Sequence, residues 1–211
     1  MNRKIILSSV IMVFVFSSSL KAQKFQFGIH AMPLLNYVTT EDQDVETASK
    51  LKFGFGLITQ YNFTDRYSFA TGVDILNRAG DISLRDTTGS YSAGFVNIPI
   101  LLKMRSNEVG YMTYFAKFGG GLSFKTSEKV EFNPEFDKNK VEELDYYISP
   151  LNITFAIGGG VEYNLGGSTS LVAELTYNRS LVDNFSSDNI YLTSDAKYKL
   201  DYIALMVGII F

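Results

Sequence analysis

Histidine occurs once in the 211-residue chain, at position 30, and cysteine is absent. A multi-histidine metal site, a thiolate metal site and a cysteine nucleophile are therefore excluded. The remaining catalytic hypothesis is a membrane enzyme that pairs His30 with a serine and an acid, as lipid hydrolases do. Nothing in the spacing favours it, and we expect no catalytic, cofactor-binding or metal-binding residue and no enzymatic activity.

Six charged residues fall at alternate positions of strand-like segments, on the face that also carries the glycines. They are Lys52, Asp74, Lys103, Lys117, Glu162 and Glu174. If this face lines the inside of a barrel, the charges could form a constriction that selects solutes. Because an unpaired charge is costly to bury, we expect instead a network of paired charges that fills the interior.

The segments that position these residues alternate apolar and polar side chains with a period of two, which is typical of β-strands. They cover residues 25–31, 52–63, 67–75, 96–104, 113–124, 153–163, 170–178 and 202–211. Most have the length that a tilted strand needs to cross a bilayer, and an even number suits closure. The sequence therefore predicts an all-β fold, a closed eight-stranded antiparallel up-and-down transmembrane β-barrel.

The connections between these segments alternate in length. Those at 64–66, 106–108 and 165–168 are short, and those at 36–50, 78–94, 125–149 and 182–197 are long. Outer-membrane barrels show this alternation, with short periplasmic turns and longer extracellular loops. Two of the long loops are rich in acidic residues: Glu41, Asp42, Asp44, Glu46, and Glu128, Glu131, Glu135, Asp137, Glu142, Glu143, Asp145.

A soluble barrel of the lipocalin type, with its apolar face inside, shows the same alternation. Three features favour the membrane. The polar face is rich in glycine, which fits a crowded lumen. The apolar face begins and ends with aromatic residues, as in a membrane girdle. The chain ends in Phe211, which we interpret as a C-terminal signal for barrel assembly.

The first residues have the features of a signal peptide. Arg3 and Lys4 precede an apolar run over 5–16, and three serines lead to Ala22. We expect a signal peptide over 1–22 and a barrel domain over 23–211, in the bacterial outer membrane. The formal net charge of −3 gives no basic patch, so we do not expect a nucleic-acid partner.

Asn97-Ile98-Pro99-Ile100-Leu101-Leu102-Lys103 resembles a strand of the PorT-like outer-membrane β-barrel family. The segments 118–121, 158–163 and 205–211 resemble the same family. The resemblance implies the barrel fold and a bacterial outer membrane. It implies no specific activity, although the family is named for a component of a protein-secretion system.

The leading functional hypothesis is a structural or surface-interaction platform that binds through its acidic extracellular loops. The alternative is a narrow pore or a subunit of an outer-membrane protein-secretion system. Expected partners are outer-membrane lipid, the barrel-assembly machinery during insertion, and a protein at the cell surface or in a secretion machine.

Overall fold

The structure is a computed structural model that describes residues 24–40, 45–84, 87–133, 148–185 and 197–211. The expected signal peptide lies outside these residues. So do eight of the acidic loop residues: Glu41, Asp42, Asp44, Glu135, Asp137, Glu142, Glu143 and Asp145. No helix among the described residues is long and apolar enough to cross a membrane.

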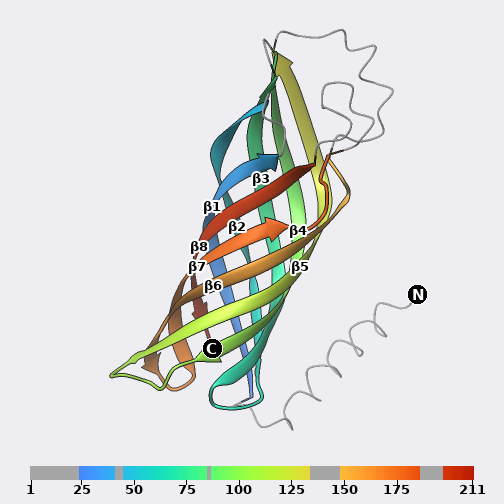
Figure 1. Ribbon diagram of the computed structural model, residues 1–211. Coiled ribbons are helices and arrows are strands. Elements are labelled where there is room, and N and C mark those ends of the chain that lie inside the picture. Colours follow the sequence, from blue (N-terminus) through green and yellow to red (C-terminus); the bar gives the residue numbers. More distant parts are fainter. Residues whose placement is uncertain (1–23, 41–44, 85–86, 134–147, 186–196) are drawn as a thin grey trace, which may run out of the picture.

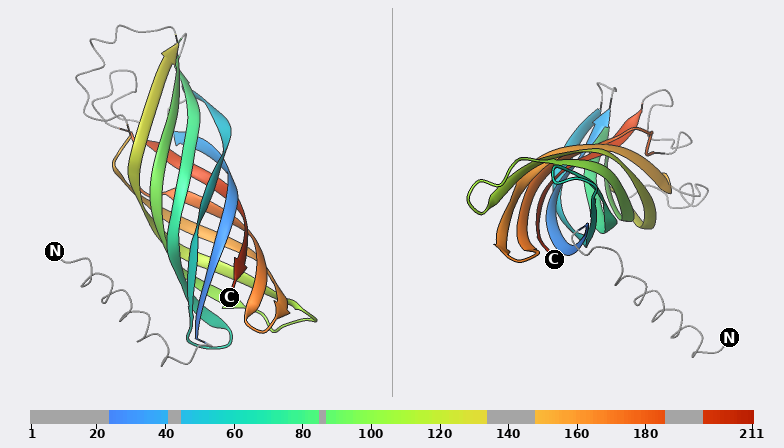
Figure 2. Two further views of the ribbon diagram at one scale, coloured as in Figure 1. Left: turned by 180° about the vertical axis from the view of Figure 1, so that it is seen from behind. Right: turned by 90° about the horizontal axis from the view of Figure 1, so that it is seen from below.

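Eight strands form a closed antiparallel barrel in which each strand pairs with its neighbours in sequence and β1 pairs with β8 (Figures 1 and 2). The strands are β1 (Phe25–Thr40), β2 (Val45–Asn62), β3 (Tyr67–Leu84), β4 (Thr87–Arg105), β5 (Met112–Asn133), β6 (Leu151–Gly166), β7 (Thr169–Ser180) and β8 (Tyr198–Ile210). Closure leaves no unpaired sheet edge where the barrel wall crosses the bilayer, which lipid requires. The predicted fold class is confirmed.

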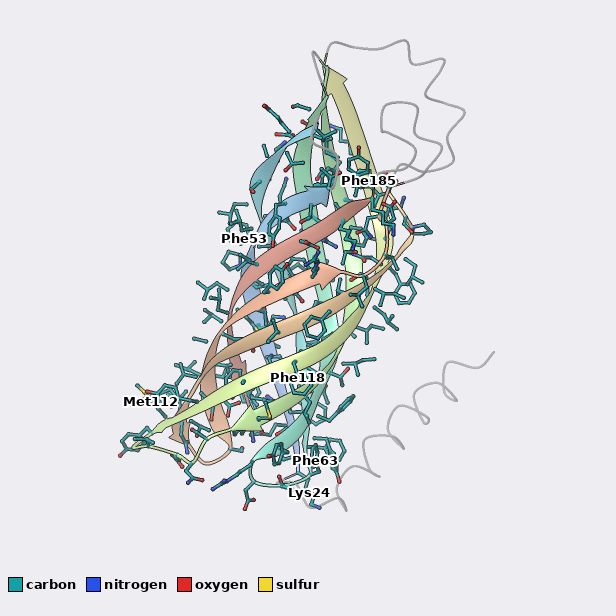
Figure 3. The ribbon with its side chains drawn as sticks, in the orientation of Figure 1. Lys24, Phe53, Phe63, Met112, Phe118 and Phe185 are labelled. Carbon is teal, nitrogen blue, oxygen red and sulfur yellow. The ribbon has the colours of Figure 1, made fainter. Side chains whose placement is uncertain are left out.

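The apolar side chains face outward, as the side chains drawn around the ribbon show (Figure 3). Phe53 and Phe118 point away from the barrel, and Leu57 and Val207 are more than half exposed, at 58% and 55%. A band of exposed apolar side chains this wide would be unstable in water and matches the hydrocarbon core of a bilayer. The lipocalin-like alternative is therefore wrong, because the apolar face is outside.

Lys24 and the C-terminus lie at the same end of the barrel as the short turns (Figures 1 and 3). In outer-membrane barrels this end faces the periplasm. Below, we call it the periplasmic end and the opposite end the extracellular end.

The strands extend further at the extracellular end than the sequence predicted. The expected loop at 78–94 is mostly strand, because β3 pairs with β4 as far as Leu84 and Thr87. Strand β5 pairs with β4 up to Asn133, whereas its pairing with β6 stops at Phe124. Outside the bilayer both strand faces can be polar, so apolar alternation disappears while backbone pairing continues.

This extracellular extension is a sheet formed by the ends of β2, β3, β4 and β5, and β5 projects furthest in Figure 1. Lys50 pairs with Asp81, which also accepts a hydrogen bond from Ser90. These contacts join β2, β3 and β4. The extension is therefore an ordered part of the barrel wall.

Candidate functional site

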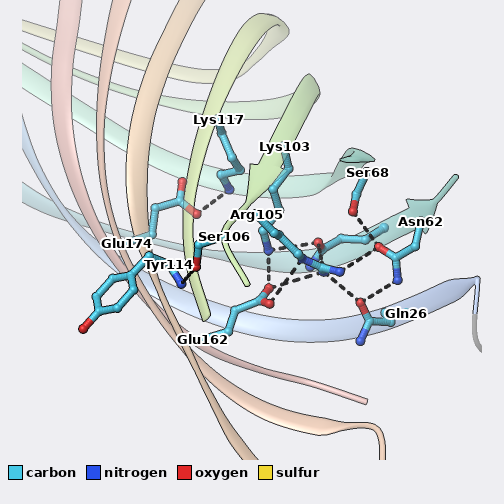
Figure 4. Close-up of polar contacts among 11 residues, drawn as sticks. Gln26, Asn62, Ser68, Lys103, Arg105, Ser106, Tyr114, Lys117, Glu162 and Glu174 are labelled. Carbon is cyan, nitrogen blue, oxygen red and sulfur yellow. Dashed lines mark hydrogen bonds and ion pairs between the residues drawn. The ribbon is translucent and has the colours of Figure 1, made fainter. Parts of the chain in front are cut away.

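The inward-facing residues near the periplasmic end form a layer of connected polar side chains (Figure 4). Lys103 and Arg105 of β4 both pair with Glu162 of β6, and Arg105 Nε lies 3.3 Å from Glu162 Oε2. The Gln60 side-chain oxygen accepts hydrogen bonds from Lys103 Nζ at 3.0 Å and from Arg105 Nη2 at 3.1 Å. Since β4 and β6 are separated by β5, these contacts tie non-neighbouring strands together across the lumen.

Arg105 connects this layer to the rim. Its guanidinium donates to the side-chain oxygens of Gln26 and Asn62, at 3.0 and 3.1 Å. Asn62 also donates to Gln26 and accepts a hydrogen bond from Ser68. We call Lys103, Arg105, Glu162, Gln60, Gln26, Asn62 and Ser68 the periplasmic layer. It contains two cations and one anion, and its carboxylate is shared by both cations.

A second ion pair lies beside this layer. Lys117 of β5 pairs with Glu174 of β7, and both side chains are largely buried. The centroid of the Phe115 ring lies 4.0 Å from Lys103 Nζ and 5.8 Å from Lys117 Nζ. Cation–π contact with this ring stabilises both ammonium groups in a space with little water.

His30 begins a chain of polar side chains in the middle of the lumen. Its Nε2 lies 3.2 Å from Asp74 Oδ1. Asp74 Oδ2 accepts a hydrogen bond from Asn97 Nδ2 at 3.0 Å, and Ser123 donates to Asn97 Oδ1 at 2.8 Å. Because the serine hydroxyl donates to Asn97 and not to the imidazole, the order of groups differs from that of a Ser-His-Asp triad.

A cavity of about 70 Å³ lies beside His30 and Asp74. Lys117 and Glu174 line one part of it, and Met32, Met206 and other apolar residues line another. The space exceeds what one water molecule needs. Gly121 also lines it, and side chains already pack against this glycine: a Cβ there would lie 2.8 Å from Thr154 Oγ1 and 2.9 Å from Asn97 Oδ1.

Toward the extracellular end, the lumen contains an apolar cluster beside buried polar side chains such as Asn36, Ser180 and Asp201. Leu34, Leu76, Phe95, Leu200 and Tyr202 are buried there in one cluster. We call these five residues the apolar plug.

Arg78 lies inside the plug. It is 1% exposed, and its guanidinium donates to the Leu200 carbonyl. The guanidinium carbon lies 5.4 Å from the centroid of the Phe95 ring and 4.9 Å from that of Tyr202. Nε and Nη1 have no hydrogen-bond partner among the described residues.

The structure places five of the six predicted lumen charges inside the barrel. Asp74, Lys103, Glu162 and Glu174 are buried, and Lys117 is nearly so. Lys52 differs: it is only half-buried, near a register shift in β2, and it forms no ion pair with the described residues. Phe211 is 53% exposed, and its backbone N–H donates to the Phe27 carbonyl at 2.7 Å.

Two inward-facing arginines, the partly buried Arg105 and the buried Arg78, were not predicted from the sequence. Arg105 continues the inward parity of Lys103, so extending the fourth alternating segment by one residue would have found it. Arg78 was assigned to a loop, and only the continued pairing of β3 with β4 shows that it faces the lumen.

Several solved structures of outer-membrane proteins are similar to this chain, and the one with a TM-score above 0.5 supports the fold. The outer membrane protein OprG of Pseudomonas aeruginosa is similar at 13% identity and a TM-score of 0.58, over 89% of this chain and 95% of OprG. The Neisserial surface protein A is similar at 12% identity and a TM-score of 0.46, over 87% and 95%. Ail, the attachment invasion locus protein of Yersinia pestis, is similar at 16% identity and a TM-score of 0.42, over 89% and 99%.

No curated protein matches the sequence. The closed barrel with its apolar side chains outside is a transmembrane barrel of the bacterial outer membrane. The geometry of the described residues inside it gives no positive indication of catalysis. The description of the matching family is "outer membrane protein beta-barrel domain", and the match covers residues 16–150, which is more than half of the chain. The chain therefore belongs to the outer-membrane β-barrel domain family.

Proposed function

We propose that the protein is a closed barrel that serves as a structural and surface-interaction platform, with its extracellular extension and loops as the interacting part. The observation that carries this proposal is the apolar plug. Side chains from β1, β3, β4 and β8 meet there and occupy part of the extracellular half of the lumen. An ion that crossed it would have to leave water for an apolar environment, at a large cost in free energy.

The two groups of paired charges nearer the periplasmic end support the same interpretation. The periplasmic layer and the Lys117–Glu174 pair are built from charges that lie within ion-pair distance of an opposite charge. Such pairs connect strands and rigidify the interior, as the structural network expected from the sequence would. A rigid, filled barrel is suited to holding a binding surface in place.

The extension supplies that surface. Glu128 accepts a hydrogen bond from the backbone N–H of Ile148 at 2.8 Å and pairs with Lys125, so Ile148 is fixed against β5. Glu46 adds negative charge at the same end, whereas the charge of Asp81 is paired with that of Lys50. We propose a protein at the cell surface as the partner, with outer-membrane lipid around the barrel.

Planar bilayer recordings test the proposal. The purified, folded protein is expected to produce no conductance steps. A variant in which Phe95 and Tyr202 are both replaced by alanine should conduct, because the two rings that flank Arg78 are gone. Folding of both proteins is checked by the heat-dependent shift in electrophoretic mobility. Regular conductance steps from the unmodified protein would overturn the proposal, whatever the variant does.

A second candidate function is a narrow pore or a secretion-system subunit. The PorT-like segment favours it, because Asn97 of that segment belongs to the chain of polar side chains that begins at His30, and Lys103 belongs to the periplasmic layer. A pore predicts conductance in the recordings. A secretion subunit predicts a stable, stoichiometric complex on native gels of mildly solubilised outer membranes, which a platform with a reversible surface partner does not.

A further inference from the structure

Three side chains with soft or borderline ligand atoms line the same cavity. They are His30 and Met32 of β1 and Met206 of β8, and their exposed fractions are 9%, 6% and 7%. His30 and Met32 are two residues apart on one strand, so they lie on the same face. The cavity thus brings together the only histidine of the chain and two of its six methionines.

The pairing of β1 with β8 explains how they meet. Ala31 pairs with Val207, and Leu34 pairs with Ala204, so the same register sets Met32 opposite Met206. Directly opposite residues of an antiparallel pair have Cβ atoms about 4.5–5.5 Å apart. His30 pairs with Gly208, which has no side chain that could fill the space beside the imidazole.

The imidazole is oriented as that of a metal-ligating histidine usually is. Such a histidine directs its other ring nitrogen toward a carboxylate, which fixes the ring and the tautomer. Here Nε2 lies 3.2 Å from Asp74, although the geometry falls short of a regular hydrogen bond. Asp74 is held in turn by Asn97, and Asn97 by Ser123. Nδ1 is buried and has no hydrogen-bond partner among the described residues.

We propose that this cavity binds one soft monovalent cation, Cu(I) or Ag(I), through His30 Nδ1 and the sulfur atoms of Met32 and Met206. Thioether sulfur is a ligand that selects Cu(I), and imidazole suits copper as well. Zinc(II) fits poorly, because its structural sites use four ligands dominated by thiolate and imidazole. The sequence analysis expected no metal site because it considered only histidine, cysteine and acidic ligands.

The competing interpretation is packing, since methionine commonly fills irregular gaps in a core. Leucine is the matched replacement, because it keeps the volume and removes the sulfur. Met112 is the control: it lies 41% exposed at the start of β5 near the turn at 106–111, away from the cavity.

Cu(I) binding is measured anaerobically, in ascorbate, by competition with bicinchoninate for copper in detergent micelles. Copper is added either before refolding or to the folded barrel. The periplasmic layer and the apolar plug lie on the two sides of the cavity and would slow the entry of the ion. The expected result is one Cu(I) per barrel, with affinity lowered about tenfold or more by M32L, M206L or H30N and unchanged by M112L. Ag(I) should raise the unfolding temperature of the unmodified protein and not that of the M32L/M206L double variant.

The proposal is overturned if the refolded barrel retains no copper under either loading condition. It is also overturned if the M32L/M206L double variant binds Cu(I) as tightly as the unmodified protein. Heat-dependent mobility confirms that each variant is folded before its affinity is compared. The copper site does not depend on whether the barrel conducts. The copper measurements therefore test the metal site, and the bilayer recordings test the proposed closed platform, independently of each other.

Discussion

Lys103 of β4 and Glu162 of β6 form an ion pair inside the barrel, across the strand that lies between them. Their side chains are 2% and 10% exposed. Arg105 pairs with the same carboxylate, so both cations of the periplasmic layer share Glu162 as their acidic partner.

We expect Glu162→Gln to destabilise the barrel strongly. Removing one partner of a buried pair leaves an uncompensated charge, which costs about 3–5 kcal/mol. The measurement is the free energy of unfolding in urea, followed by tyrosine fluorescence and by gel mobility, since the chain has no tryptophan. Glu108→Gln, in an exposed turn, is the control and should change stability by less than about 0.5 kcal/mol. Equal effects of the two substitutions would contradict the role of the layer.

Replacing Arg78 by an apolar residue of similar size should have the opposite effect on stability. Its guanidinium is buried in the apolar plug with one carbonyl as hydrogen-bond acceptor. Replacing a buried ionic group by an apolar one of similar volume is often neutral or stabilising by about 1–4 kcal/mol. We therefore expect Arg78→Met to raise the urea midpoint, whereas Arg78→Ala should lower it because a cavity remains. A large loss of stability in Arg78→Met would show that the cation itself holds the plug together.

Two adjacent glycines of β6 offer a matched test of strand packing. A Cβ on Gly160 would lie 2.2 Å from the backbone oxygen of Ala173 on β7. A Cβ on Gly159 would meet only the Phe115 oxygen, at 3.1 Å. Gly160→Ala should therefore lose about 1–3 kcal/mol or more, because the neighbouring backbone must move. Gly159→Ala should refold with nearly unchanged yield and urea midpoint, and similar losses in both variants would argue against this close approach.

The sequence predicted the orientation of side chains better than their partners. Alternation is a local property, so it placed Asp74, Lys103 and Glu162 on one face without knowledge of the fold. Which of these charges meet depends on the register of all the strands around the barrel. The pairing of Lys103 with Glu162 across an intervening strand follows from that register and cannot be derived from spacing.

The positions of the strand ends were also predicted less well from the sequence. In the bilayer, apolar residues mark the outward face, and the prediction followed them closely. Beyond the bilayer, strand residues such as Asp81 and Ser90 are polar and resemble loop residues, although they still pair with each other. Arg78 was missed for this reason, and the apolar plug with it.

The absence of cysteine allows a clean test of membrane orientation. Ser127 is exposed in the extracellular extension, and Glu108 is exposed in a short turn at the opposite end. In intact cells, a membrane-impermeant maleimide should label Ser127→Cys and leave Glu108→Cys unlabelled. Both should react after the outer membrane is broken. The reverse pattern would show that the long strands face the periplasm.

Phe211 is expected to act in assembly more than in stability. Its ring is 53% exposed at the end of the chain, and its backbone pairs with Phe27, whose ring is 59% exposed. Because both rings lie on the lipid-facing surface, Phe211→Ala and Phe27→Ala should lose similar amounts of apolar contact and have similar stability after refolding in detergent. In cells, only Phe211→Ala should reduce the fraction that reaches the heat-modifiable, membrane-inserted form, if the assembly machinery recognises the terminal aromatic residue. Equal amounts of inserted protein in the two variants would mean that Phe211 is an ordinary lipid-facing residue.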